Sequence, residues 1–122
     1  MLTNVVPILR VFDVNLARDF YLGFLEFNLA FEHRFDDAAP YYLGIEKDRC
    51  VLHLSEHFGD ATPGAHVRIE ASGLDQLADR WRAKQCKNAR PGAPQEMPWG
   101  TKELTLTDPF GNRLTFAESL AD

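Results

Sequence analysis

The chain has 122 residues, 45% of them hydrophobic, and a net charge of −5 without any basic cluster. This length fits one domain or two small, similar halves that share a core. The acidic balance argues against nucleic acid and anionic membrane surfaces as partners. No apolar run has membrane-spanning length, and the N-terminus does not resemble a signal peptide. We therefore expect a cytoplasmic protein whose two cysteines, Cys50 and Cys86, are reduced packing residues.

The first half of the chain predicts a strand, a helix and three more strands. Asp13 precedes an amphipathic pattern, so it should cap a helix over residues 14–25. Helical spacing assigns the apolar face of that helix to Leu16, Ala17, Phe20, Tyr21 and Phe24. Apolar and alternating runs predict strands at residues 5–12, 27–35, 41–46 and 50–55.

The second half repeats this order after a linker at residues 56–64, which contains proline and glycine. Ser72 is expected to cap a second helix, whose apolar stripe is Leu74, Leu77, Ala78 and Trp81. The clearest strand signal is a hairpin, in which two alternating runs flank the turn residues 108–112. The remaining expected segments are a strand at 65–71, a short strand at 87–90 and a loop at 91–100.

The two halves also match in sequence. Leu16-Ala17-x-x-Phe20 recurs as Leu77-Ala78-x-x-Trp81, 61 residues later, which is half the chain. We therefore predict an α+β fold of two βαβββ modules, at residues 5–55 and 65–118. One helix can cover only one face of each sheet. The other faces are expected to curve around a cleft, where ligands usually bind.

Strand alternation assigns several polar side chains to these open faces. Leu52 and Leu54 belong under the first helix, so their neighbours point the other way. The polar residues assigned to the open faces are Arg10, His53, Ser55, His66, Arg68, Glu70, Glu103, Thr105, Arg113 and Thr115. The pattern fits either the solvated face of an antiparallel sheet or a ligand cleft lined from several strands.

Few of these residues indicate catalytic chemistry. His53 and His66 are plausible metal ligands, but a catalytic divalent metal usually has at least three protein ligands. The other two histidines, His33 and His57, are expected at the surface or in loops. The sequence has no Ser-His-Asp order, P-loop or glycine-rich dinucleotide signature, so nucleophilic and nucleotide chemistry have no support.

A set of short segments runs in order along nearly the whole chain. They are Val6-Pro7-Ile8-Leu9 before Asp13-Val14, Phe20-Tyr21 with Leu25-x-Phe27, Val51-Leu52-His53-Leu54-Ser55, Pro98-Trp99-Gly100, Asp108-Pro109-x-Gly111-Asn112, and Phe116. Together they resemble the vicinal-oxygen-chelate superfamily, which includes glyoxalase I, and most closely its bleomycin-resistance branch. Glu26 stands where that family usually has glycine after the first helix, so we expect this turn to differ in shape.

The resemblance also bears on metal binding. Metal-dependent members take ligands from four strand positions, which here are Val6, His53, His66 and Thr115. Valine cannot bind a metal, and threonine is a poor ligand. The resemblance therefore implies no catalytic residue, no metal and no cofactor. The rival hypothesis is a metal-dependent lyase of the glyoxalase type, or a related enzyme, with His53 and His66 as partial ligands.

The function implied by the resemblance is sequestration of a drug. A homodimer would bind a cationic, planar aromatic molecule of the bleomycin type in clefts at the dimer interface, without changing it chemically. The expected ligand-binding residues are Trp99, Phe35, Tyr42 and Phe58 for stacking, Glu103 and Glu70 for positive charge, and His53, His66 and Arg68 for orientation. A small-molecule sensor on the same fold is a third hypothesis, since fold does not fix function.

Overall fold

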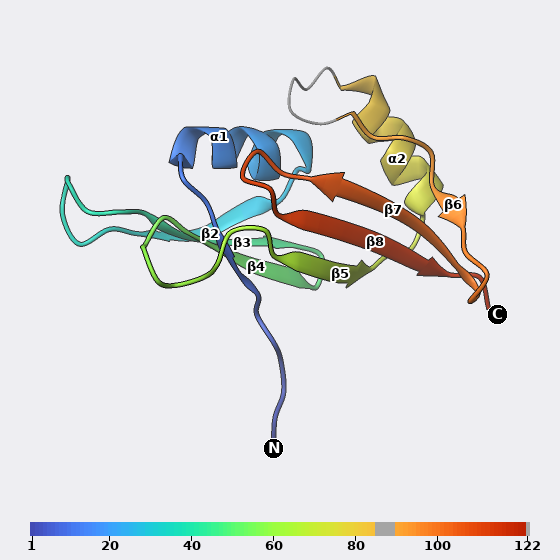
Figure 1. Ribbon diagram of the computed structural model, residues 1–122, viewed down its shortest axis with the longest axis horizontal. Coiled ribbons are helices and arrows are strands. Elements are labelled where there is room, and N and C mark those ends of the chain that lie inside the picture. The colour runs from blue at the N-terminus through green and yellow to red at the C-terminus, as the bar shows by residue number, and fades with distance from the viewer. Residues whose placement is uncertain (85–89, 122) are drawn as a thin grey trace.

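The computed structural model describes residues 1–84 and 90–121, which form two four-stranded sheets with their helices on one side (Figure 1). The strand order is β1-β4-β3-β2 in the first sheet and β5-β8-β7-β6 in the second. The strands of the first sheet are β1 (Ile8–Arg10), β2 (Asn28–His33), β3 (Tyr42–Lys47) and β4 (Cys50–Ser55). Those of the second are β5 (His66–Glu70), β6 (Gln95–Glu96), β7 (Thr101–Thr107) and β8 (Arg113–Ser119).

The two sheets repeat one pattern of pairing. β1 runs parallel to β4, and β5 runs parallel to β8, whereas all other neighbouring strands are antiparallel. A helix follows the first strand of each sheet. The predicted α+β fold of two βαβββ modules is therefore confirmed. Among the described residues, no helix has the length and apolar character needed to cross a bilayer.

The first helix changes its type halfway along. It begins as α1 (Val14–Arg18) and continues as a π-helix, η1 (Asp19–Phe24), so the helix predicted over residues 14–25 is confirmed, with a change of helix type at Asp19. The Asp13 cap is confirmed, because its carboxylate accepts the N–H groups of Asn15 and Leu16. The aromatic residues of η1, Phe20, Tyr21 and Phe24, are buried in the core as predicted. Leu16 was wrongly predicted to lie in the core and is 40% exposed.

The second helix, α2 (Leu74–Ala83), buries Leu74, Ala78 and Trp81 as predicted, but its capping residue was predicted wrongly. Gly73 rather than Ser72 precedes the helix, at a φ of 64°, and it has no side chain to act as a cap. The carboxylate of Glu118, from β8, accepts the N–H groups of Gly73 and Leu74 at 2.8 and 3.3 Å. A negative charge at this position also complements the helix dipole.

The segment before the hairpin differs from the prediction as well. Residues 91–100 were expected to be a loop, but they contain the short edge strand β6, which pairs with β7. The strand predicted at residues 87–90 lies almost entirely outside the described residues. The hairpin of β7 and β8 and its turn are confirmed, and Gly111 adopts a φ of 89° there.

The two modules share one apolar core, as expected from the length of the chain. Trp81 of α2 lies between the modules, because its ring centroid is 4.9 Å from that of Phe116 and 6.3 Å from that of Phe24. Leu9 and Leu54 from the first sheet and Leu114 from the second are buried in the same cluster. The helices and the inner sheet faces therefore stabilise one another.

A buried polar network around Asp108 joins the modules beside this core. The Asp108 carboxylate accepts hydrogen bonds from the Tyr21 hydroxyl at 2.6 Å, from the Phe110 N–H at 2.8 Å, and from both the N–H and the side-chain amide of Asn112. The Asn112 amide also donates to the carbonyl of Arg10 at 2.9 Å. Burial, with Asp108 beside it, raises the pKa of Tyr21, so this hydroxyl remains a donor. The network ties the hairpin turn to η1 and β1.

The turn after η1 keeps the backbone conformation that glycine favours, although Glu26 occupies it. Glu26 adopts a φ of 64°, in the left-handed region. Its carboxylate forms ion pairs with Arg80 of α2 and with Lys84, which directly follows that helix. Lys84 also donates to the carbonyls of Gly23 and Phe24 at 2.9 Å. The backbone at this position therefore stays in the region usual for glycine, and the Glu26 side chain adds contacts between the modules.

Stability should depend on the charge of Glu26 at low pH. Hydrogen bonds from Arg80 and Lys84 lower the pKa of Glu26 from 4.5 to about 2. Its stabilising contribution should be complete above pH 4.5 and should be lost as the pH falls toward 2. We therefore expect the urea midpoints of the wild type and Glu26→Gln to differ at neutral pH and to converge on acidification. A difference that does not change over this pH range would contradict the role of the ion pairs.

The free edge of the first sheet is irregular. All six residues of β2 are exposed, and the strand pairs only with β3. Its register shifts between Leu29 and Phe31, which forms a bulge at Ala30. A bulge leaves one residue unpaired and increases the local twist.

Candidate functional site

A charged hydrogen-bonded cluster lies on the open face of the second sheet. One carboxylate oxygen of Glu103, Oε2, accepts three hydrogen bonds, from Arg68 at 2.8 Å, Trp99 at 2.9 Å and Thr101 at 2.6 Å. Glu103 itself is only 8% exposed. The hydrogen bond from Arg68, then those from Thr101 and Trp99, lower the pKa of Glu103 to about 2. The cluster brings together three of the predicted site residues.

The indole ring of Trp99 is fixed by a hydrogen bond at its N–H edge, while most of the side chain is exposed to solvent. Its indole N–H is fixed by Glu103, yet the residue is 65% exposed. It lies in a turn closed by a hydrogen bond from the Gly100 N–H to the Met97 carbonyl, and Gly100 adopts a φ of 91°. An exposed ring in a fixed orientation is suited to stacking against a planar ligand.

His66 belongs to a separate chain of hydrogen bonds on the same sheet. Its Nε2 lies 2.7 Å from the hydroxyl of Thr115, which lies 2.8 Å from the hydroxyl of Thr105. Thr115 is 5% exposed, whereas His66 is open to solvent. The imidazole is therefore held by one nitrogen and presents its other edge to the open face.

The first sheet contributes an aromatic cluster. The Tyr42 hydroxyl lies 2.8 Å from Nδ1 of His53, and the ring of Phe31 contacts both side chains. Phe31 was not among the predicted site residues. Its ring covers Gly44 so closely that a Cβ at that position would lie 2.1 Å from it. A glycine inside a strand is a signal of such close approach, and it was the available sequence indication of this cluster.

The other two predicted stacking residues lie in loops. Phe35 is 79% exposed and packs edge-on against His33 and, more distantly, His57. Phe58 is 97% exposed. Ser55 pairs with Tyr42 and so shares its sheet face, as alternation predicted, but linker residues bury it: it donates to Asp60 and accepts the N–H of His57.

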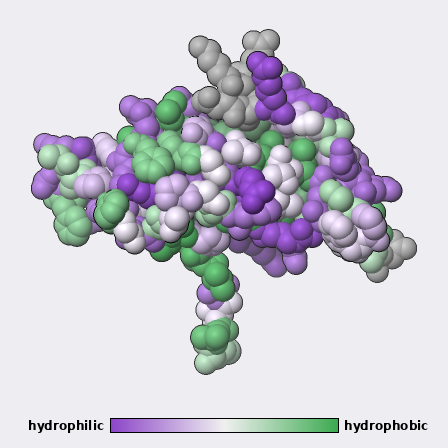
Figure 2. Space-filling model, in the orientation of Figure 1, coloured by the Kyte–Doolittle hydropathy of each residue, from purple (hydrophilic) through white to green (hydrophobic). Residues whose placement is uncertain are grey.

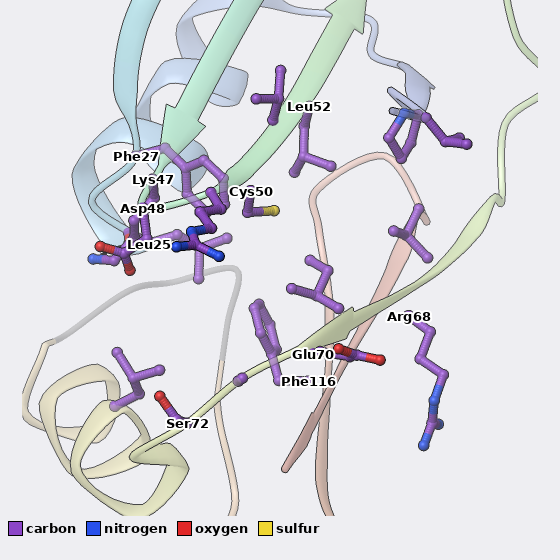
Figure 3. A pocket seen from close by; sticks show the side chains of 18 of the residues that line it. Leu25, Phe27, Lys47, Asp48, Cys50, Leu52, Arg68, Glu70, Ser72 and Phe116 are labelled. Carbon is purple, nitrogen blue, oxygen red and sulfur yellow. Dashed lines mark hydrogen bonds between the residues drawn. The ribbon is translucent and has the colours of Figure 1, made fainter. Parts of the chain in front are cut away.

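A groove of about 660 Å³ separates the start of β4 from β5 (Figure 3). Its apolar lining consists of Val5, Pro7, Leu25, Phe27, Val51, Leu52, Val67, Ile69, Ala71, Leu77, Trp81 and Phe116. Lys47, Asp48, Arg49 and Glu70 add charged groups. Two of the predicted site residues, Arg68 and Glu70, line this groove, and Figure 3 shows Arg68 extending from β5 on the side away from Leu25 and Phe27.

The positions of metal ligands in the superfamily do not fit a metal here. His53 and His66 belong to different sheets, and each has a hydrogen-bonding partner at one ring nitrogen. The described residues contain no group of three or more histidine, cysteine, aspartate or glutamate side chains arranged to hold an ion. Val6 and Thr115, at the other two positions, supply no strong ligand.

One comparison with known proteins shows the family of the chain. A family model described as a glyoxalase superfamily protein matches residues 1–122, the whole chain. No curated protein matches the sequence.

Several solved structures share the fold. A bleomycin-binding protein complexed with bleomycin is 19% identical, with a TM-score of 0.73 over 97% of this chain and 99% of that one. A bleomycin resistance determinant encoded on the transposon Tn5 is 17% identical, with a TM-score of 0.73 over 98% and 100%. TnmS3, an antibiotic binding protein from Streptomyces sp. CB03234, is 21% identical, with a TM-score of 0.72 over 98% of each chain. At these identities the likeness establishes the fold alone.

Proposed function

Because the chain belongs to the glyoxalase superfamily, we propose that it is a cytoplasmic binding protein that sequesters a cationic, planar aromatic drug of the bleomycin type without changing it chemically. Structures that share its fold include a bleomycin-binding protein and a bleomycin resistance determinant, which supports this class of ligand. Trp99 carries the proposal, because its exposed ring is fixed by the hydrogen bond to Glu103. A fixed aromatic ring loses little conformational entropy when a ligand stacks on it.

The other proposed contacts surround this ring and the aromatic cluster of the first sheet. His53, Tyr42 and the newly identified Phe31 would line one wall of the cleft. His66, Arg68 and Glu103 would line the other. Phe35 and Phe58, which are exposed on loops, would contact the outer part of a large ligand.

We propose that two copies of the chain form the cleft together. The N-terminal arm, residues 1–7, projects from the body of the protein (Figure 1), and Figure 2 shows this projection mostly in the colour of hydrophobic residues. Met1, Leu2 and Val5 are almost fully exposed. Clustered exposed apolar side chains usually mark an interaction surface. A homodimer would cover the arm and wall the cleft from both sides.

Light scattering at micromolar concentration should therefore give about twice the chain mass of 13.8 kDa. A monomer at that concentration would contradict the shared cleft.

The direct test of function is a thermal shift. Only a ligand that binds the native state raises its melting temperature. We expect a bleomycin-type drug to raise it in a concentration-dependent manner, with the drug recovered unchanged afterwards. No shift at any drug concentration, or chemical modification of the drug, would overturn the proposal.

Metal dependence separates this proposal from a metal-dependent glyoxalase-type lyase. With Val6 and Thr115 at two ligand positions, the purified, untagged protein should contain no stoichiometric metal. Zinc, nickel, manganese or iron should not be required for the thermal shift. One equivalent of any of these metals per chain, measured by elemental analysis, would favour the enzyme instead.

A further inference from the structure

The ion pair between Arg68 and Glu103 decides which chemical group of a ligand can bind beside Trp99. Glu103 is the acidic residue nearest the exposed indole, and its Oε2 already accepts three hydrogen bonds. Its charge is also balanced by Arg68 at 2.8 Å. Oε2 is therefore occupied by three donors, and the charge of the carboxylate is already balanced, so Glu103 attracts a cationic group less than an unpaired carboxylate would.

Arg68, in contrast, has N–H donors that make no hydrogen bond to any described residue. A guanidinium group has five N–H donors in a rigid plane. Among the described residues, the Arg68 side chain makes one hydrogen bond, from Nη2 to Glu103, and it is 52% exposed. Its position on β5 places it opposite Thr115 of β8, on the open face of the sheet. The unused N–H groups can therefore reach an acceptor on a bound molecule.

The distances also place this donor close to the ring of Trp99. Arg68 Nη2 and Trp99 Nε1 donate to the same oxygen at 2.8 and 2.9 Å, so the two nitrogens lie within about 6 Å of each other. An aromatic ring with a directly attached carbonyl group is small enough to contact both side chains. Glu103 keeps the two donors at this spacing.

We propose that Trp99 and Arg68 form a subsite for a planar aromatic ring that bears a carboxylate or carboxamide. The indole packs against the ring, and the free guanidinium N–H groups bind the carbonyl-type oxygen. Glu103 is a positioning residue that orients both side chains. This inference rests on the proposed binding function and specifies one part of its ligand. Any positive charge on the ligand would lie elsewhere, for example near the exposed Glu70.

The test uses three probes that share one ring: 2-naphthoate, 2-naphthamide and 2-naphthylmethylamine. The chain has two tryptophans, so the indole N–H resonance of Trp99 can be followed by NMR while that of the buried Trp81 serves as an internal control. We expect the naphthoate and the naphthamide to bind at least about 5-fold more tightly than the amine, because Arg68 can donate only to the first two.

Matched arginine variants separate a local contact from the general charge of the sheet. Arg68→Gln should weaken both acceptor probes by about 10-fold and should not weaken the amine, because it removes the charge that balances Glu103. Arg113 is exposed on the same sheet, opposite His66, and removal of its charge should leave the preference intact. Equal effects of Arg68→Gln and Arg113→Gln would overturn the proposal.

The role of Glu103 requires a further pair of variants. Glu103→Leu removes the shared acceptor and should reduce the preference for both acceptor probes, whereas Glu103→Gln keeps one oxygen and should restore part of it. Folding is checked by thermal unfolding of each variant. Tighter binding of the amine, with the Trp99 resonance still responding, would overturn the acceptor subsite and leave the proposed binding function standing. If the Trp99 resonance responds to none of the probes, the subsite proposal is wrong. The binding function is tested separately, by the thermal shift with the drug.

Discussion

Replacing Asp108 with alanine should lower the free energy of unfolding by about 3–5 kcal/mol. The substitution removes the acceptor for the Tyr21 hydroxyl, the Phe110 and Asn112 N–H groups and the Asn112 amide, all in the joint between the modules. Each buried donor left without a partner costs about 1–3 kcal/mol, with partial relief from relaxation of the turn. Urea unfolding followed by circular dichroism measures the loss.

A variant that removes only one of these hydrogen bonds shows how much a single bond contributes to the free energy of unfolding. Tyr21→Phe removes one hydrogen bond to Asp108 and keeps the packing of the ring, so it should cost about 1–2 kcal/mol. In the double variant the two effects should not add, because Asp108 and Tyr21 share one contact. If Asp108→Ala costs less than Tyr21→Phe, the network does not join the modules in the way described.

Replacing Trp99 with alanine should weaken binding of a bleomycin-type ligand by about 1–3 kcal/mol, which is about 5- to 150-fold. The indole supplies an exposed aromatic face, and stacking of an aromatic ring of the ligand on such a face contributes about 0.5–1.5 kcal/mol beyond the area that it buries. Folding should change little, because Glu103 keeps its hydrogen bonds from Arg68 and Thr101. Isothermal titration measures the affinity, and quenching of tryptophan fluorescence should disappear mostly with Trp99.

The second tryptophan provides the contrast. Trp81 is buried between Phe24 and Phe116, so Trp81→Ala should destabilise the fold by about 3–5 kcal/mol, as for other core aromatic residues. If Trp99→Ala unfolds the protein or leaves the affinity unchanged, Trp99 is a structural residue and the site assignment is wrong.

The sequence predicted the features that depend on local pattern. Asp13 next to an amphipathic run predicted a helix start, and Trp81 within an apolar stripe predicted a core position, and both are confirmed. The errors arise where a distant residue decides the local structure. Glu118 caps α2 from across the second sheet, which no reading of residues 72–75 could reveal. The change from α-helix to π-helix at Asp19 likewise has no signal in the apolar spacing, which fits either kind of turn.

In the candidate site, too, the local pattern predicted the sheet face of a residue but not its contacts with distant residues. Alternation placed His66, Arg68 and Glu103 on one sheet face, but it could not show that Arg68 and Trp99 both donate to one oxygen of Glu103. That arrangement depends on the pairing of β5 and β7 with β8 and on the turn before β7. Phe31 was missed for a related reason, because the bulge in β2 shifts its register against β3.

That bulge also affects how the protein behaves when it is concentrated. An exposed edge strand with apolar side chains can extend its sheet by pairing with another chain, which is a common route to aggregation. In β2, Leu29 and Phe31 are exposed, but the unpaired residue between them interrupts the row of backbone donors and acceptors. An incoming strand could follow this edge for only a few residues. The irregular edge should therefore keep folded chains from aggregating through their first sheets.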